Sequence, residues 1–414
     1  MKEKILDNLD KPEQLEKLYR SNKITFKSTF QFIYPDIKEN QVAQVWHERL
    51  NFEHDEISWG TSNELIFVLI ASLLAGFIAK IPAFTTISEE FFYPRNIGFI
   101  VFPLLSAYFF WKQKINTQKL IIVSVAFLIA VFYINWLPND AKSDTLILAC
   151  IHLPLFLWAV LGFTFIGEKI NDFQRRLDFL RYNGDLVVMC AIIVIAGVLL
   201  TIITLGLFKL IDIKIEELYF QYIVILEVAA TPIIGTYLVQ TNPQLVNKVS
   251  PVIAKIFTPL VLVTLIIYLS AVIWTGKDPY NDREFLLIFN LLLIGVMAII
   301  LFSIAEISQN KGSKLGTILL LSLSSVTIIL NGIALSAILF RITEWGITPN
   351  RLAVLGSNLL ILINLLMVTF RLFRSVKDRN ELENVENSIA RFLPIYAVWT
   401  IIVSFIFPLL FNFK

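Results

Sequence analysis

From residue 63 onward the sequence alternates long apolar runs with short polar segments. A helix of about 20 apolar residues spans the ~30 Å hydrocarbon core of a bilayer. The runs lie at 63–81, 97–111, 119–137, 145–167, 186–208, 219–239, 252–274, 285–306, 315–340, 352–372 and 392–411. This pattern predicts an all-α, polytopic transmembrane bundle of about eleven spans over residues 63–411. Because run 97–111 is short, totals of ten and twelve stay open.

Residues 1–60 show a different pattern, in which apolar side chains recur at intervals of three and four within a polar segment. This spacing is typical of amphipathic helices. The apolar positions are Leu15, Leu18, Tyr19, Phe26, Phe30, Ile33, Val42, Val45, Trp46 and Leu50. We therefore expect residues 1–60 to form a small cytoplasmic segment of three short helices. Sixty residues make a marginal core, so this segment is expected to dock on the membrane part.

Composition agrees with a membrane protein and excludes a soluble globular chain. Apolar residues make up 56% and charged residues 16%, against roughly 45–50% and about 25% in soluble domains. The net charge of +2 gives no reason to expect nucleic-acid binding. Cys150 and Cys190 lie inside apolar runs and are interpreted as small core residues.

The distribution of Lys and Arg predicts the orientation, because loops rich in these residues stay in the cytoplasm. One basic cluster, Lys169, Arg175, Arg176 and Arg181, falls in the expected loop 168–185. Fewer basic residues fall in the alternate loops. The sequence therefore predicts a cytoplasmic N-terminus and an external C-terminus.

Four polar stretches carry a family resemblance. They are residues 91–99 (FFYPRNIGF), 182–185 (YNGD), 281–285 (NDREF) and 341–351 (RITEWGITPNR). Together they resemble an uncharacterised bacterial multi-pass membrane family, domain of unknown function 4153, and residues 1–60 resemble its Bacteroidetes-type members. The resemblance covers most of the chain. It implies a protein of the bacterial cytoplasmic (inner) membrane, and it implies no activity.

A first candidate site lies in the predicted span 219–239. Glu227 stands near its middle, and an ionisable side chain at that depth is costly and often functional. Pro232 lacks a backbone N–H and leaves the carbonyl of Val228 without its usual partner, next to Thr231. A carboxylate beside a broken turn is how several transporters bind a proton or cation. The alternative is a paired or protonated Glu227 that only joins helices.

A second candidate is a polar pocket near the outer surface. His152, Asn290, Asn331 and Asn358 are expected at similar depths in four spans. Charged residues of two outer loops would lie above them: Asp278, Asp282, Arg283, Arg341, Glu344 and Arg351. The alternative is that the asparagines only make hydrogen bonds between helices, each worth about 0.6 kcal/mol.

Familiar catalytic and cofactor signatures are missing from the sequence. It has no P-loop, no nucleophile elbow, no zinc-protease motif and no dinucleotide fingerprint. His47 and His54 lie among acidic residues, but their spacing does not match a zinc site and indicates a solvated face. We therefore predict no cofactor and no metal.

Three functions stay open at this point. The first is a permease-like protein for a small solute, ion or lipid. The second is a membrane sensor or assembly scaffold that binds a cytoplasmic partner through residues 1–60. The third is a lipid- or glycan-modifying membrane enzyme that uses acids of the outer loops, such as Asp278, Asp282 and Glu344.

Overall fold

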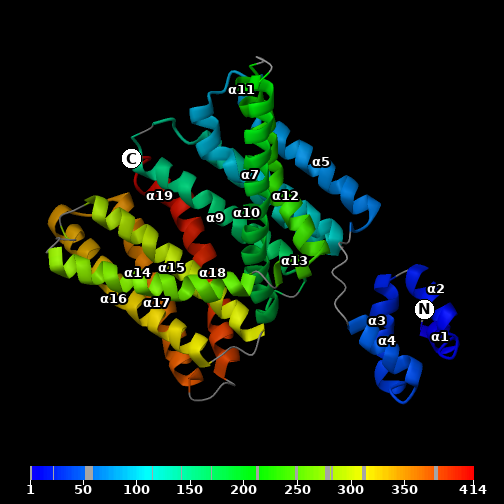
Figure 1. Cartoon of the computed structure of the whole chain (residues 1–414). Coiled ribbons are helices and arrows are strands. Elements are labelled where there is room, and N and C mark those ends of the chain that lie inside the picture. Colours follow the sequence, from blue (N-terminus) through cyan, green and yellow to red (C-terminus); the bar gives the residue numbers. More distant parts are fainter. Residues whose placement is uncertain are drawn as a thin grey trace. The chain divides into compact units, whose positions relative to one another are not determined.

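The structure is a computed structural model of the 414-residue chain (Figure 1). It describes residues 2–21, 23–51, 59–113, 115–140, 142–168, 170–210, 214–247, 250–275, 280, 283–309, 314–376 and 381–414. Within these ranges the secondary structure is helical and no strand occurs. The predicted all-α, polytopic class is confirmed.

The chain divides into two compact units, residues 1–58 and residues 59–414. The first unit contains α1 (Lys2–Leu6), α2 (Pro12–Ser21), α3 (Lys23–Ile33), the 3-10 turn η1 (Tyr34–Asp36) and α4 (Gln41–Asn51). Its buried core consists of Ile5, Leu15, Phe26, Phe30, Ile33, Ala43, Trp46 and Leu50. The helical spacing thus located most of this core, whereas Val45, which follows the same spacing, is 66% exposed.

The second unit is a bundle of long helices. Its first half contains α5 (Ser62–Ala79), α6 (Ile81–Phe84), α7 (Glu89–Gln113), α8 (Thr117–Trp136), α9 (Asp144–Phe165) and α10 (Phe173–Leu210). A composite helix follows, made of α11 (Glu216–Leu218), the π-helical η2 (Tyr219–Val224) and α12 (Ile225–Thr241). The rest contains α13 (Gln244–Asn247), α14 (Ser250–Thr275), α15 (Arg283–Gln309), α16 (Lys314–Trp345), α17 (Pro349–Ser375), α18 (Leu382–Ile401), the π-helical η4 (Ile402–Ile406) and α19 (Phe407–Leu410).

Within the described residues, eight helices are long and apolar enough to cross a membrane. These are α5, α8, α9, α10, α16, α17, the composite helix that ends in α12 and the one that begins with α18. The described parts of α14 and α15 supply the shorter apolar segments Thr258–Ser270 and Leu292–Ile304. Each predicted apolar run falls on a helix, but eight qualifying helices do not confirm a total of about eleven.

Helix α10 corrects one sequence-based boundary. The segment 168–185 was expected to be a loop, yet α10 begins at Phe173 and runs for 38 residues. Leu177, Phe179 and Tyr182 are buried, because the charged residues of this segment alternate with apolar ones at helical spacing. The polar beginning of α10 is therefore part of the helix packing.

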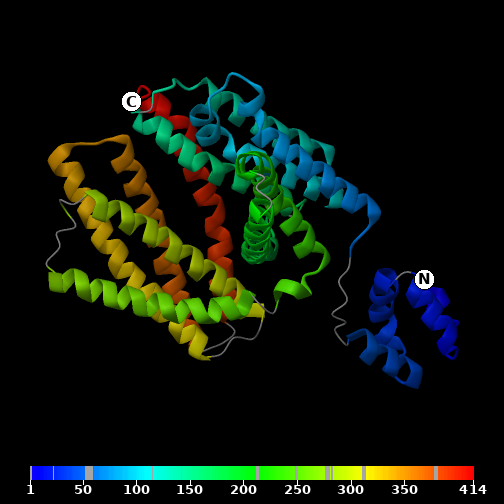
Figure 2. The same cartoon turned by 45° about the horizontal axis from the view of Figure 1, so that its top comes forward.

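Two large apolar clusters hold the bundle together. One joins α5, α7, α9, α10 and α12, and the other joins α10 with α14, α15, α16, α17 and α18. Figure 2 shows the corresponding blue-to-cyan and yellow-to-orange helices on opposite sides of the red helix α18. Trp158 of α9 packs against both clusters. The junction between the clusters runs along α9, α10 and α18.

Basic side chains complete several helix ends. Arg95 of α7 donates to the carbonyls of Ile134 (2.5 Å) and Leu137 (3.3 Å) at the end of α8. Lys119 donates to the carbonyl of Gly167, just after α9. The last carbonyls of a helix lack intrahelical partners, and cations stabilise that end of the helix dipole. The buried side chains of Arg95 and Lys119 therefore have a structural role at the ends of helices.

Candidate functional site

The first predicted site lies on α12. Glu227 is half-buried, and its carboxylate faces α10 at Gly197, where an added Cβ would stand 3.7 Å from Oε2. No described residue forms a hydrogen bond or ion pair with this carboxylate. Thr231 donates to the backbone carbonyl of Glu227 at 2.7 Å, and α12 continues through Pro232. The three residues lie together, outside the cavity described below.

The structure separates the asparagines of the second predicted site from His152. Asn358 of α17 donates to Asn290 of α15 at 2.7 Å, so these two amides meet between helices, as the structural alternative expected. Asn331 of α16 is fully buried, and neither atom of its amide has a hydrogen-bond partner among the described residues. Neither the amide pair nor Asn331 lines the cavity around His152.

The charged members of the second site lie at the junction of α16 and α17. Arg351 donates to the carbonyls of Trp345 and Gly346, each at 2.7 Å, and thereby caps the end of α16. The guanidinium of Arg341 lies 5.2 Å from the centre of the Trp345 ring, and Glu344 precedes that ring in sequence. Asp278, Asp282 and the side chain of Arg283 lie outside the described part of the chain.

His152 lines a cavity of about 240 Å³ between α9, α15, α17 and α18. Helix α18 packs against the other three (Figure 1). The wall is mainly apolar and includes Met297, Ile361 and Leu393. Leu155 and Ile294 also line it and are 48% and 54% exposed. In a membrane-spanning bundle such exposed apolar side chains face lipid, so the cavity has a rim on the lipid side.

A buried apolar layer fixes the depth of the polar groups in this cavity. Leu148 of α9, Ala353 of α17 and Val403 of η4 pack into one cluster. Positions four residues apart share a helix face. One turn further along these helices lie His152, Ser357 and Trp399, which all line the cavity. These three side chains therefore form one polar layer next to the apolar cluster, and the rest of the cavity continues away from it.

Hydrogen bonds orient the side chains of this layer. The indole N–H of Trp399 donates to Ser357 Oγ at 2.9 Å. His152 Nδ1 lies 2.9 Å from the carbonyl oxygen of Leu148, which only accepts, so Nδ1 carries a proton. In the neutral ring Nε2 is then an acceptor. No described residue bonds Nε2, which leaves it available to a ligand.

The polar beginning of α10 supports the cavity wall. Asn183 Oδ1 accepts from the indole N–H of Trp158, a lining residue, at 2.8 Å. Tyr182 shares a 2.8 Å hydrogen bond with Thr236 of α12. Gly184 lies against Phe302 of α15, whose ring would clash with any Cβ at this position. The stretch 182–185 thus joins α9, α12 and α15.

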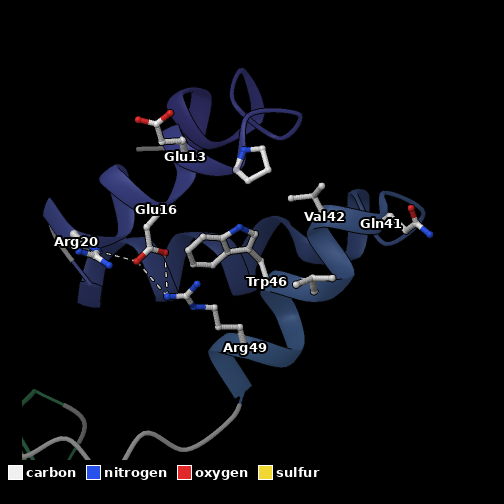
Figure 3. Close-up of a pocket in the computed structure, with 9 residues that line it drawn as sticks. Glu13, Glu16, Arg20, Gln41, Val42, Trp46 and Arg49 are labelled. Carbon is white, nitrogen blue, oxygen red and sulfur yellow. Dashed lines mark hydrogen bonds and ion pairs between the residues drawn. The ribbon is translucent and has the colours of Figure 1, made fainter.

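A second pocket, of about 740 Å³, lies within residues 1–58 (Figure 3). Val42, Val45 and Trp46 form its apolar wall. Glu16 lies between two arginines, 2.8 Å from Arg20 and 3.0 Å from Arg49. The hydrogen bond from Arg20, aided by the charge of Arg49, lowers the pKa of Glu16. One carboxylate is thus shared by two guanidinium groups at the pocket rim.

Sequence reasoning expected His152 in a pocket with asparagines and loop charges, and the structure places it at the cavity between α9, α15, α17 and α18. The cavity is mainly apolar, and its other lining residues with polar groups are Trp158, Ser357, Tyr396, Trp399 and Thr400. Among the described residues that line it, none is Asp, Glu, Lys or Arg. The described residues also contain no group of three His, Cys, Asp or Glu side chains placed to hold a metal ion.

Comparison with protein-family models, with curated proteins and with solved structures finds no match for the chain.

Proposed function

We propose that this chain is a permease-like membrane protein that takes a lipid-like molecule from the bilayer into the cavity between α9, α15, α17 and α18. The observation that carries the proposal is an apolar cavity of about 240 Å³ with lipid-facing residues at its rim. Ligand sites are typically concave, apolar and situated between packed units. This cavity has all three properties.

The surroundings of the cavity favour an apolar occupant. Its rim residues Leu155 and Ile294 are exposed within apolar helices, so the medium at the opening is hydrocarbon and not water. A hydrocarbon chain can enter through such a rim without dehydrating a polar group, whereas a hydrophilic solute would lose its hydration. Small hydrophilic solutes therefore fit this cavity poorly.

Native mass spectrometry of the delipidated protein tests the proposal. Ala298 lines the cavity and is exposed at its opening, so Ala298→Phe is expected to obstruct it. Wild type should bind one long-chain amphiphile, and the variant should bind it at least tenfold more weakly. Ala196→Phe on an exposed face of α10 is the matched control and should bind normally. Equal binding by Ala298→Phe, or no binding by wild type, contradicts the proposal.

A coupling role for Glu227 belongs to the same permease hypothesis. Its carboxylate is half-buried beside Gly197 and has no ion-pair partner among the described residues. If proton or cation movement accompanies ligand movement, Glu227→Gln should abolish it and leave both ligand binding and the thermal unfolding midpoint unchanged. Unaltered coupled movement in this variant rules the residue out.

A scaffold function is the second candidate, favoured by the pocket of residues 1–58. Its apolar wall of Val42, Val45 and Trp46, flanked by charges of both signs, fits an amphipathic helix of a partner protein. Val45→Asp changes the exposed wall and leaves the core intact. Under the scaffold hypothesis, this variant loses a larger complex on native gels. Under the permease hypothesis alone, it migrates as wild type does.

The proposal includes a location and a family. The protein would reside in a bacterial cytoplasmic membrane with its N-terminus in the cytoplasm, and it would belong to the domain of unknown function 4153 family. The basic residues Arg175 and Arg176 near the start of α10 support this orientation. Membrane-impermeant thiol labelling of Lys27→Cys and Arg175→Cys in intact cells should fail at both positions and succeed after lysis. Labelling of both positions in intact cells would show that the N-terminus and the start of α10 lie outside the cytoplasm, opposite to the proposed topology.

A further inference from the structure

The polar layer formed by His152, Ser357 and Trp399 limits which polar group a ligand can place in the cavity. We propose that the cavity selects an uncharged chain molecule with one hydroxyl group, a long-chain or isoprenoid alcohol, whose O–H donates to Nε2 of His152. This inference rests on the proposed function, because it names the ligand class of the same cavity.

The absence of charge at the cavity wall argues against an ionic ligand. Among the described lining residues, no Asp, Glu, Lys or Arg occurs. An ion buried in an apolar site needs a countercharge or several hydrogen bonds, because desolvation is costly. A phosphate or carboxylate would find no countercharge here and only the hydroxyl hydrogens of Ser357 and Tyr396 as donors, so the cavity favours a ligand whose buried polar group is neutral.

The position of the polar layer supports the same conclusion. His152 lies eight residues after Asp144, the first residue of α9, which is about 12 Å along the helix axis. That depth places the imidazole within the ~30 Å hydrocarbon core and away from the headgroup region. The apolar cluster of Leu148, Ala353 and Val403 closes the adjoining space. A charged headgroup could not lie beside His152 while remaining in water.

The remaining hydrogen-bonding capacity indicates a hydroxyl group. Trp399 donates to Ser357, and the Thr400 hydroxyl donates to the carbonyl of Ala397 at 2.7 Å. The donor hydrogens of Trp399 and Thr400 are therefore already used, whereas the oxygens of Ser357 and Tyr396 accept from Trp399 and Asn364, and their own hydroxyl hydrogens have no acceptor among the described residues. His152 offers an acceptor, because its Nδ1 donates to Leu148. A ligand hydroxyl can donate to Nε2 and accept from a lining hydroxyl hydrogen, and its chain can extend along Ile361 and Leu393 into the apolar part of the cavity.

A ligand panel tests the inference by competition in native mass spectrometry of the full-length protein. The panel consists of one long-chain alcohol, its methyl ether, its phosphate monoester and the parent alkane. The alcohol should bind about tenfold more tightly than the ether, which is the size of one net hydrogen bond, and the phosphate should bind least. In His152→Phe, which keeps a ring but removes the acceptor, alcohol and ether should bind equally.

The outcomes separate this inference from the proposed function. If ether and alkane compete as well as the alcohol in wild type, the hydroxyl selection is wrong, but the cavity still binds chains. If the phosphate monoester binds best, the assigned ligand class is wrong. If no panel member binds, the proposed function fails as well. Because the comparison of alcohol with ether uses wild type, it remains decisive even if His152→Phe does not fold.

Discussion

Arg181 of α10 donates to Glu386 of α18 at 2.9 Å, and the two side chains are only 9% and 5% exposed. Arg181 also reaches Asp178 at 3.0 Å, but that carboxylate is 40% exposed. The buried pair joins α10 to α18, two of the three helices at the junction of the apolar clusters. It therefore helps to set the position of α18 in the cavity wall.

This pair gives the first prediction. Glu386→Gln removes the buried counterion of Arg181 and leaves it with only the more exposed Asp178, and breaking a buried pair typically destabilises a protein by about 3–5 kcal/mol. Asp178→Asn is the matched control, because the Asp178 carboxylate is 40% exposed and solvent screens its attraction to Arg181, so its loss should cost about 0–1 kcal/mol. Thermal unfolding in detergent should show a large decrease in midpoint for the first variant and little change for the second. Equal midpoints would contradict a structural role for the pair.

Two glycines give the second prediction. At Gly184 a Cβ would stand 1.7 Å from the Phe302 ring, whereas at Gly332 of α16 nothing lies within 4 Å. Gly184→Ala should therefore destabilise the bundle by about 1–3 kcal/mol through overpacking. Gly332→Ala should be neutral or stabilising, because alanine favours a helix over glycine by about 1 kcal/mol. Thermal midpoints measured side by side check this contrast, and a reversed order would refute the contact between α10 and α15.

The pH dependence of residues 1–58 gives the third prediction. The pKa of Glu16 is lowered from its ordinary value of 4.5, chiefly by the hydrogen bond from Arg20. A lowered pKa in the folded state means that the stabilisation is complete above about pH 4.5 and is lost as the pH falls through the folded-state value. Denaturant unfolding of the 1–58 fragment, followed by circular dichroism, should show this loss in acid.

Glu16→Gln is expected to reduce stability at pH 7 and to flatten its acid dependence. Glu13→Gln is the control, because Glu13 lies 2.8 Å from Lys17 with 80% of its side chain exposed. This control should retain most of the acid dependence. An equal flattening in both variants would show that the charge cluster around Glu16 is not responsible.

The helices could be predicted well from the sequence, because a chain segment that crosses lipid has to be helical unless it belongs to a closed barrel. Every backbone polar group inside hydrocarbon needs an internal partner, so apolar runs of sufficient length predict helices without any knowledge of packing. The start of α10 at Phe173 was missed because Arg176 and Arg181 suggested a loop. Arg181 is instead neutralised by Glu386, more than 200 residues away, and such a distant partner leaves no local signal.

The candidate site was harder to predict than the helices, because it depends on contacts between residues that are distant in the sequence. His152 was noticed because it is polar within an apolar run, and the structure does place it at a cavity. The cavity itself is formed by gaps between Met297, Ile361 and Leu393, which have the same apolar character as fully packed residues. Hydrophobic periodicity identifies which residues face inward, but it does not reveal where their side chains leave space.

Photoaffinity labelling tests the central claim, that the cavity takes a chain molecule from the bilayer. The probe is a long-chain alcohol with a diazirine in its chain, irradiated with the protein in vesicles and mapped by peptide mass spectrometry. Met297 and Ile361 are only 4% and 5% exposed, yet both line the cavity. The account predicts adducts on these two residues, and their loss in Ala298→Phe. Adducts confined to lipid-facing side chains such as Ile195, with none on Met297 or Ile361, would contradict it.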